Sequence, residues 1–60
     1  YGLSKREAEV AWLYGQGYSL SKVASRLFIS TGTAQTHIKS IYRKLDIHSR
    51  NELIEIILPR

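Results

Sequence analysis

The chain has 60 residues, 43% of them apolar, with nine Lys or Arg against five Asp or Glu and a formal net charge of +4. This length accommodates one small domain, and the absence of cysteine excludes disulfides, thiolate metal ligands and cysteine nucleophiles. The basic balance favours a polyanionic partner.

No apolar run approaches the roughly 18 residues of a membrane span, and no signal segment opens the chain. We therefore expect a soluble, cytoplasmic domain without membrane contact. Because the chain contains no Met, even at position 1, we expect residues 1–60 to be one domain of a longer protein.

Apolar residues recur at three- and four-residue spacing throughout, which predicts an all-α fold of four helices. The first helix is expected over residues 5–14, where Ser4 is the N-cap and Glu7 completes a capping box. The Gly-rich stretch 15–17 supplies the positive φ that often follows a helix. Trp12 falls outside the inward apolar stripe, so we expect it to cover a loop edge or to contact something outside the chain.

A second, short helix is expected over residues 20–27, with Ser19 as its N-cap and one apolar face. Isolated helices below about 12 residues are marginal, so this helix must be held by its neighbours. Phe28 and Ile29 open a tight three-residue link, and we expect these two apolar residues to pin that corner.

The third helix, residues 31–45 with Ser30 as its N-cap, is the longest. On a helical wheel at about 100° per residue, its apolar side chains share one arc: Ala34, Ile38, Ile41, Tyr42 and Leu45. The opposite arc and its flanks carry small, polar and basic residues: Gly32, Gln35, Thr36, Lys39, Ser40 and Arg43. One side of this helix is therefore expected to pack and the other to face solvent.

A short helix, a tight link and a longer helix with a basic outward face form the helix-turn-helix arrangement of DNA-binding proteins. An α-helix fits the major groove, where outward side chains meet base edges. Gln35 can pair with adenine, Thr36 can hydrogen-bond a base or touch a thymine methyl group, and Lys39 can reach guanine. We predict that these three residues contact bases.

The first turn of the same helix presents free backbone N–H groups and the positive end of the helix dipole, which predicts a phosphate site at Ser30, Thr31 and Thr33. Gly32 costs the helix about 1 kcal/mol relative to Ala. Either a Cβ there would obstruct a close approach, or glycine is simply tolerated in a first turn.

The sequence is also compatible with other classes of function, and some of these are favoured more than others. A basic helix face is also typical of plain solvation, so a small basic protein-interaction module is the main alternative. An enzyme is not expected, because Ser21 with Lys22 or His37 as base lacks an oxyanion hole and a pocket. His37 borders the core face and His48 lies in a loop, so they form a poor metal or catalytic pair, and no cofactor is expected.

The chain resembles the LuxR-type (GerE-like) helix-turn-helix. The residues that carry the likeness span nearly the whole sequence: Leu3 to Glu7, Val10, Gly17, Val23, Ala24, Leu27, Ile29, Ser30, Thr33, Thr36 to Ile38, Ile41 to Leu45, Ser49 and Arg50. The resemblance implies the C-terminal output module of a bacterial transcription regulator that binds double-stranded DNA. It also implies a preceding sensor or receiver domain, and it admits RNA polymerase as a further partner.

The family's base-reading surface falls on Gln35, Thr36 and Lys39, where the helical wheel independently places the outward face. Its phosphate contacts map onto Ser21, Lys22, the turn from Ser30 to Thr33, and Arg43 or Lys44. The family usually has Val or Ile in place of Ala34 and a basic residue in place of Gln35, so its base preferences are not transferred. Asp46 stands where Gly or Asn commonly ends the helix, so a less well capped end is expected.

The fourth helix is expected to begin after Ser49, which repeats the capping-box pattern with Glu52, and to run to about Leu58 before Pro59. Relatives dimerise through this helix. Leu53, Ile54 and Ile57 are expected to face the core. Ile56 and Leu58 add apolar surface, so we predict a homodimer interface at these two positions; the alternative is that a small core uses them.

Overall fold

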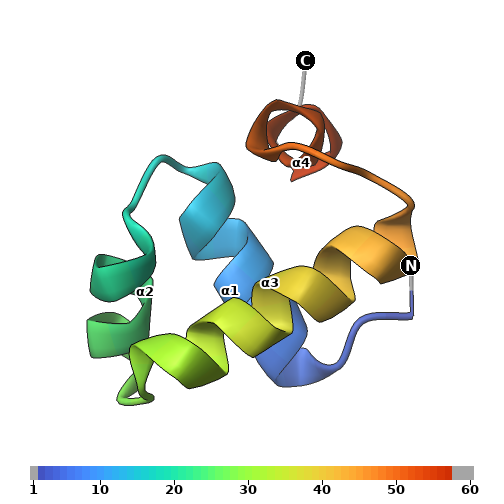
Figure 1. The fold of residues 1–60 in the computed structure, drawn as a ribbon. Coiled ribbons are helices and arrows are strands. Elements are labelled where there is room, and N and C mark those ends of the chain that lie inside the picture. Colours follow the sequence, from blue (N-terminus) through green and yellow to red (C-terminus); the bar gives the residue numbers. More distant parts are fainter. Residues whose placement is uncertain (1, 58–60) are drawn as a thin grey trace.

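The computed structural model describes residues 2–57, and within that part of the chain it contains four helices and no strand (Figure 1). These are α1 (Lys5–Gly15), α2 (Leu20–Leu27), α3 (Thr31–Leu45) and α4 (Arg50–Ile57). The all-α prediction is confirmed, and α1 extends one residue beyond its predicted end. The predicted end of the fourth helix at Leu58 and Pro59 lies outside the described residues.

Serine side chains begin the helices as the sequence predicts. Ser4 Oγ accepts the N–H of Glu7 at 3.2 Å, and Glu7 Oε1 accepts the N–H of Ser4 at 2.9 Å, which completes the capping box. Ser19 caps α2 and Ser30 caps α3 through single bonds of 3.1 and 3.0 Å. Ahead of α4, the Ser49 N–H donates to Glu52 at 3.1 Å. The helix starts are therefore determined locally.

Two helices end in a left-handed residue that is not glycine. Phe28 ends α2 with φ 58°, and Asp46 ends α3 with φ 55°. After Asp46, the Ile47 N–H donates to the carbonyl of Tyr42 at 3.0 Å, so this helix end is hydrogen-bonded despite the unusual residue. The expectation that Phe28 helps to pin this corner is wrong. Its side chain is 95% exposed, because the left-handed turn directs it outward, and Ile29 alone packs against the core.

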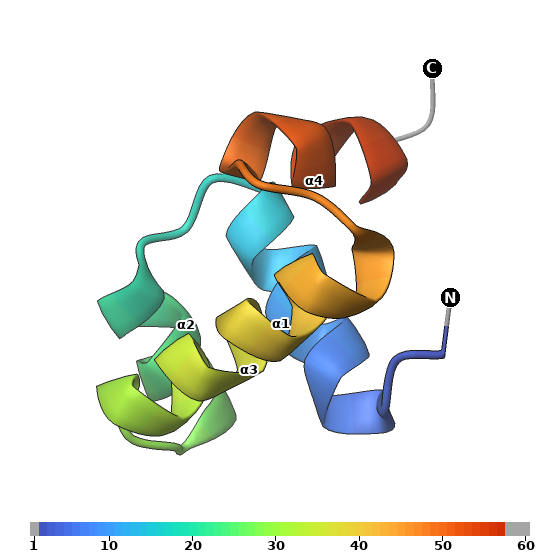
Figure 2. The same ribbon diagram turned by 45° about the vertical axis from the view of Figure 1, so that its right-hand side comes forward.

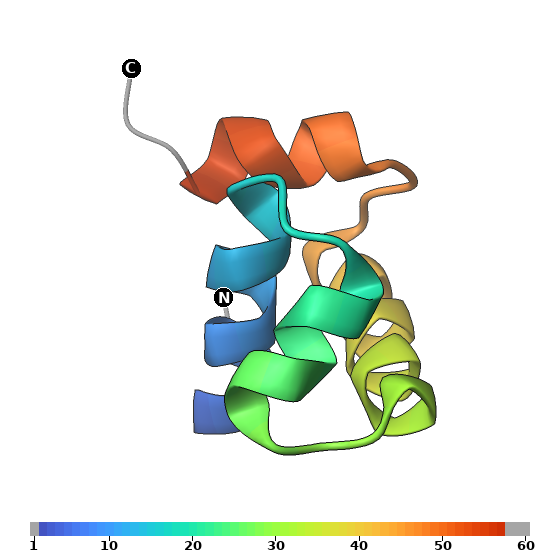
Figure 3. The ribbon, with the colours of Figure 1, turned by 90° about the vertical axis from the view of Figure 1, so that its left-hand side faces the viewer.

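The core lies where α1 meets the other three helices, and α2 also packs along α3 (Figures 2 and 3). In Figure 3, α4 lies across the C-terminal end of α1, and α2 and α3 lie side by side. The buried cluster is apolar throughout: Val10, Ala11, Val23, Ile38, Ile41, Ile47 and Leu53. No helix within residues 2–57 has the length and apolar character needed to cross a membrane.

The packing of α4 differs from the sequence prediction. Leu53 is fully buried, and Ile56 and Ile57 pack against the core, whereas Ile54 is half-buried and stands outside that set. Positions 53, 56 and 57 have the i, i+3, i+4 spacing of one helix face. The prediction that Ile54 faces the core is therefore wrong, whereas Leu53 and Ile57 face it as predicted. Ile56 also contacts the core, and its role in a dimer stays a prediction.

Arg50, at the start of α4, fastens this helix to the end of α1. Its Nε donates to the carbonyl of Tyr14 at 2.9 Å, its Nη2 donates to the carbonyl of Tyr18, and its guanidinium lies 4.1 Å from the centre of the Tyr14 ring. Helix C-termini carry partial negative charge, which favours a cation there.

At the other end of α4, a Cβ on Gly15 would lie 2.9 Å from Cδ1 of Ile57, so this glycine allows the two helices to approach closely.

Candidate nucleic-acid interface

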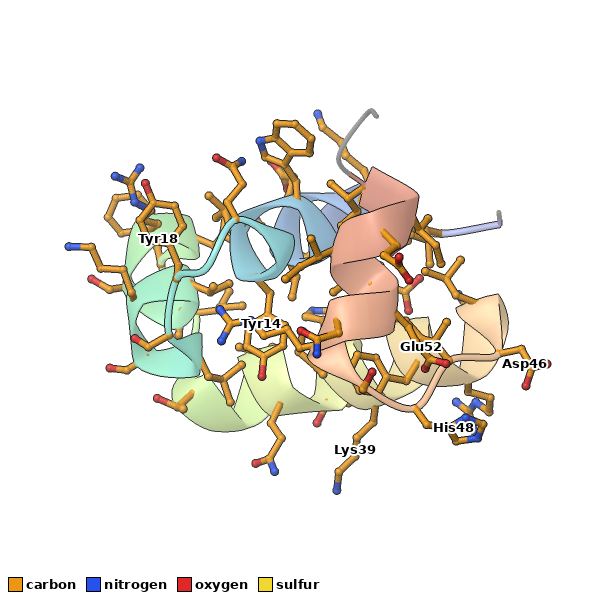
Figure 4. All side chains as sticks on the ribbon, turned by 90° about the horizontal axis from the view of Figure 1, so that it is seen from above. Tyr14, Tyr18, Lys39, Asp46, His48 and Glu52 are labelled. Carbon is orange, nitrogen blue, oxygen red and sulfur yellow. The ribbon has the colours of Figure 1, made fainter. Side chains whose placement is uncertain are left out.

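The outward face of α3 is built as the helical wheel predicts. Gln35, Thr36 and Lys39 are exposed, whereas Ala34 and Ile41 on the opposite side have no exposed surface. Lys39 extends from α3 away from the other helices (Figure 4). The structure therefore brings the three predicted base-contact residues together on one solvent-facing surface of the longest helix.

The Thr36 hydroxyl is partly used within its own helix. It donates to the carbonyl of Gly32 at 3.0 Å, a bond that serines and threonines commonly make to the preceding turn. The hydroxyl oxygen still has acceptor capacity, and the residue is exposed. In this state Thr36 is suited to accept a hydrogen bond from a base or to touch a thymine methyl group, and not to donate.

The first turn of α3 has the open backbone groups of a phosphate site. The first intrahelical bond runs from the N–H of Ala34 to the carbonyl of Ser30 at 3.0 Å, so the N–H groups of Thr31 and Gly32 precede the ladder. Ser30 Oγ also donates to Thr33 Oγ1 at 2.9 Å. A Cβ on Gly32 would meet only Ser30 Oγ, at 3.9 Å, so contacts inside the protein do not require glycine there.

The predicted phosphate contacts farther from this turn are also at the surface. Ser21 and Lys22 are exposed in the first turn of α2, and Arg43 is exposed in the last turn of α3. Arg43 and Lys39 line an open hollow of about 480 Å³ together with Tyr42, Asp46, Ile47 and His48. The sequence analysis placed His48 in a loop and gave it no role. The fold brings it beside Lys39 and Arg43.

Lys44 has a different environment from Arg43. Its Nζ donates to Glu7 Oε1 at 2.7 Å, and the Glu7 side chain is only 8% exposed. Glu7 Oε2 also accepts the Ser40 hydroxyl at 2.6 Å. Hydrogen bonds from Lys44, Ser40 and the Ser4 backbone lower the pKa of Glu7 from the usual 4.5 to about 2. From the sequence, Glu7 was predicted only to complete the capping box of α1. Its contacts with Ser40 and Lys44 of α3 were not predicted.

His37, Ile56 and Leu58 are the predicted residues that belong to neither the base-contact nor the phosphate-contact set. His37 is half-buried at the edge of the core face of α3. Residues 2–57 contain no group of three or more His, Cys, Asp or Glu side chains arranged to hold a metal ion. Of the two predicted dimer residues, Leu58 lies outside the described residues. Ile56 lines an apolar groove of about 240 Å³ with Trp12, which is 49% exposed.

Comparison with known proteins decides the class of this surface. The sequence model described as "Bacterial regulatory proteins, luxR family" matches residues 2–57, which include all four helices. The chain belongs to the LuxR family. It is thus a DNA-binding helix-turn-helix domain of a bacterial transcription regulator and not an enzyme.

Individual relatives agree with the LuxR assignment. The chain is 41% identical to the oxygen regulatory protein NreC of Staphylococcus haemolyticus (strain JCSC1435) over 58 residues. It is 40% identical to the proteins of the same name from Staphylococcus carnosus (strain TM300) and Staphylococcus aureus (strain JH9). These matches cover 97% of this chain but only 27% of each relative. No solved structure matches the chain significantly.

Proposed function

We propose that this LuxR domain binds duplex DNA sequence-specifically, with α3 in the major groove. The observation that carries the proposal is the division of α3 into an apolar side, with Ala34 and Ile41 fully buried, and an exposed side bearing Gln35, Thr36 and Lys39. A helix held in this way offers three hydrogen-bonding side chains to base edges without disturbing its own packing.

Phosphate contacts hold the domain on the duplex without reading sequence. The proposed set comprises Ser21 and Lys22 on α2, Ser30, Thr31 and Thr33 at the start of α3, and Arg43 or Lys44 near its end. The exposed first turn of α3 supports this set because its unpaired N–H groups and dipole favour an anion. The net charge of +4 supports it as well.

Selection of bound sites from random duplex DNA tests the proposal. We expect enrichment of a defined sequence, with an affinity that falls steeply as salt concentration rises because bound phosphates release counterions. Weak binding without enrichment, or without salt dependence, would instead favour the basic protein-interaction module. A Gln35→Ala, Thr36→Ala and Lys39→Ala triple variant is the matched control, since these exposed side chains contribute little packing.

We further propose that the domain is the C-terminal output module of a longer cytoplasmic regulator with an N-terminal sensor or receiver domain. The matched relatives support this, because the aligned region covers 27% of their length. RNA polymerase is the partner proposed for a regulator of transcription. We also propose a homodimer through α4, which would place two recognition helices in successive major grooves about 34 Å apart.

A further inference from the structure

The two neighbouring cations in the last turn of α3 lie in different surroundings. Within residues 2–57, Lys44 forms an ion pair with Glu7, whereas the side chain of Arg43 forms no hydrogen bond or ion pair. Because consecutive residues of a helix are about 100° apart around its axis, Lys44 and Arg43 point in different directions. Arg43 shares the outward side with Lys39, and Lys44 faces α1.

The Glu7 carboxylate is a buried partner that Lys44 cannot leave without an energetic cost. Its carboxylate is almost entirely covered and accepts two further hydrogen bonds, from the Ser4 N–H at 2.9 Å and from the Ser40 hydroxyl at 2.6 Å. If Lys44 moved to a DNA phosphate, this carboxylate would lose its cation while remaining covered. Leaving a buried charge unpaired is strongly unfavourable, so the exchange gains little.

We infer that Glu7 keeps Lys44, whose side chain is 40% exposed, in this ion pair when DNA binds, and that Arg43 supplies the contact to the DNA backbone at this end of α3. The inference rests on the proposed function and decides between its two candidate cations. Glu7 binds Ser40 and Lys44, one turn apart on α3, and so joins this side of the helix to α1.

The salt dependence of DNA affinity distinguishes the two cations. A Glu7→Gln, Lys44→Met double variant removes both charges together. We expect it to keep the fold because glutamine can also complete a capping box and accept from Ser40, and methionine keeps the apolar stem of lysine. Circular dichroism confirms folding before binding is measured. Arg43→Gln is the matched single change on the exposed side.

We expect the double variant to have the same slope of log affinity against log salt as the wild type, and Arg43→Gln to lower that slope by about 0.9. A loss of about 0.9 in the double variant would show that Lys44 contacts phosphate and would overturn the inference. An unchanged slope in Arg43→Gln would overturn it as well.

A second measurement needs no DNA. In an NMR titration of side-chain carboxyl groups, Lys44→Met should raise the pKa of Glu7 relative to the wild type. An unchanged pKa would mean that the pair is absent in solution, which overturns the inference and leaves the proposed function intact. If the wild type binds no duplex even at low salt, the proposed function fails, and the inference about DNA fails with it, whatever the titration shows.

Discussion

Phe28 combines a left-handed backbone with an almost fully exposed aromatic side chain. The left-handed conformation costs residues other than Gly, Asn and Asp about 1–2 kcal/mol, because Cβ crowds the following carbonyl. An exposed ring recovers none of this through packing. The position is therefore a local source of instability in the turn between α2 and α3.

We predict that Phe28→Gly raises the free energy of unfolding by about 0.5–1 kcal/mol, since the relief of strain exceeds the entropy cost of glycine. Urea unfolding measures the change. Phe28→Ala is the control, because alanine removes the ring and keeps the strained Cβ. Equal stability of the two variants would show that the left-handed turn is not the cause.

Glu7 should make stability depend on acidity. Its pKa is lowered to about 2 in the folded protein, so folding favours the ionised form. Its contribution is complete above the usual pKa of 4.5 and is lost as pH falls from there towards 2. We predict that the melting temperature falls over this range in the wild type and falls less in Glu7→Gln.

Thermal melts followed by circular dichroism between pH 2 and 6 test this prediction. Glu9→Gln is the matched control. Glu9 pairs with Arg6 at 3.4 Å with both side chains 44% exposed, and such surface pairs contribute little. If Glu9→Gln changed the acid dependence as much as Glu7→Gln, the buried network would not be its source.

Sequence and structure agree best at residues whose partners are close in the chain. Ser4, Ser19 and Ser30 cap helices through bonds to residues three positions later, so local spacing was sufficient. The Glu7–Lys44 pair joins residues 37 positions apart, and its existence depends on how α1 crosses α3. Chain spacing alone carries no signal for such a contact.

At the scale of elements, the buried and exposed faces of α3 could be predicted because its length gives several turns of clear helical periodicity. The buried face of α4 could not be predicted in the same way. Four of its eight residues are Leu or Ile, so more than one rotation buries an apolar stripe. The docking against α1, with Arg50 bound to the end of that helix, selects the stripe of Leu53, Ile56 and Ile57.

We predict that Arg50→Lys lowers the free energy of unfolding by about 1–2 kcal/mol. Lysine keeps the charge but cannot bind two carbonyls in a fork while stacking on Tyr14. Chemical denaturation measures the loss. Arg43→Lys, on the exposed side of α3, should leave stability unchanged. A fully stable Arg50→Lys variant would mean that charge alone holds α4 in place.

At the scale of the whole molecule, the rotation of α4 changes which side chain tests the proposed homodimer. Ile56 packs against the core of its own chain, whereas Ile54 does not. We therefore predict that Ile54→Lys weakens self-association and leaves the helical signal intact, whereas Ile56→Lys also destabilises the fold because it places a charge in packed surroundings.

Sedimentation equilibrium measures association, and circular dichroism measures folding. Trp12, the one tryptophan of the chain, gives a fluorescence signal for the groove beside α4. If Ile54→Lys associates as the wild type does while Ile56→Lys dissociates and stays folded, the exposed part of the Ile56 side chain forms the dimer contact. The prediction from the sequence that Ile56 lies in the dimer interface would then be correct.

The exposed side of α3 is proposed to contact base pairs. The most direct test of this claim compares the affinities of wild type, Lys39→Ala and Arg43→Ala for the selected duplex and for random duplex. Lys39→Ala is predicted to lose about 5- to 150-fold on the selected duplex and much less on random DNA. Arg43→Ala should weaken both duplexes alike and preserve their ratio. Equal losses on both duplexes for Lys39→Ala would contradict the claim.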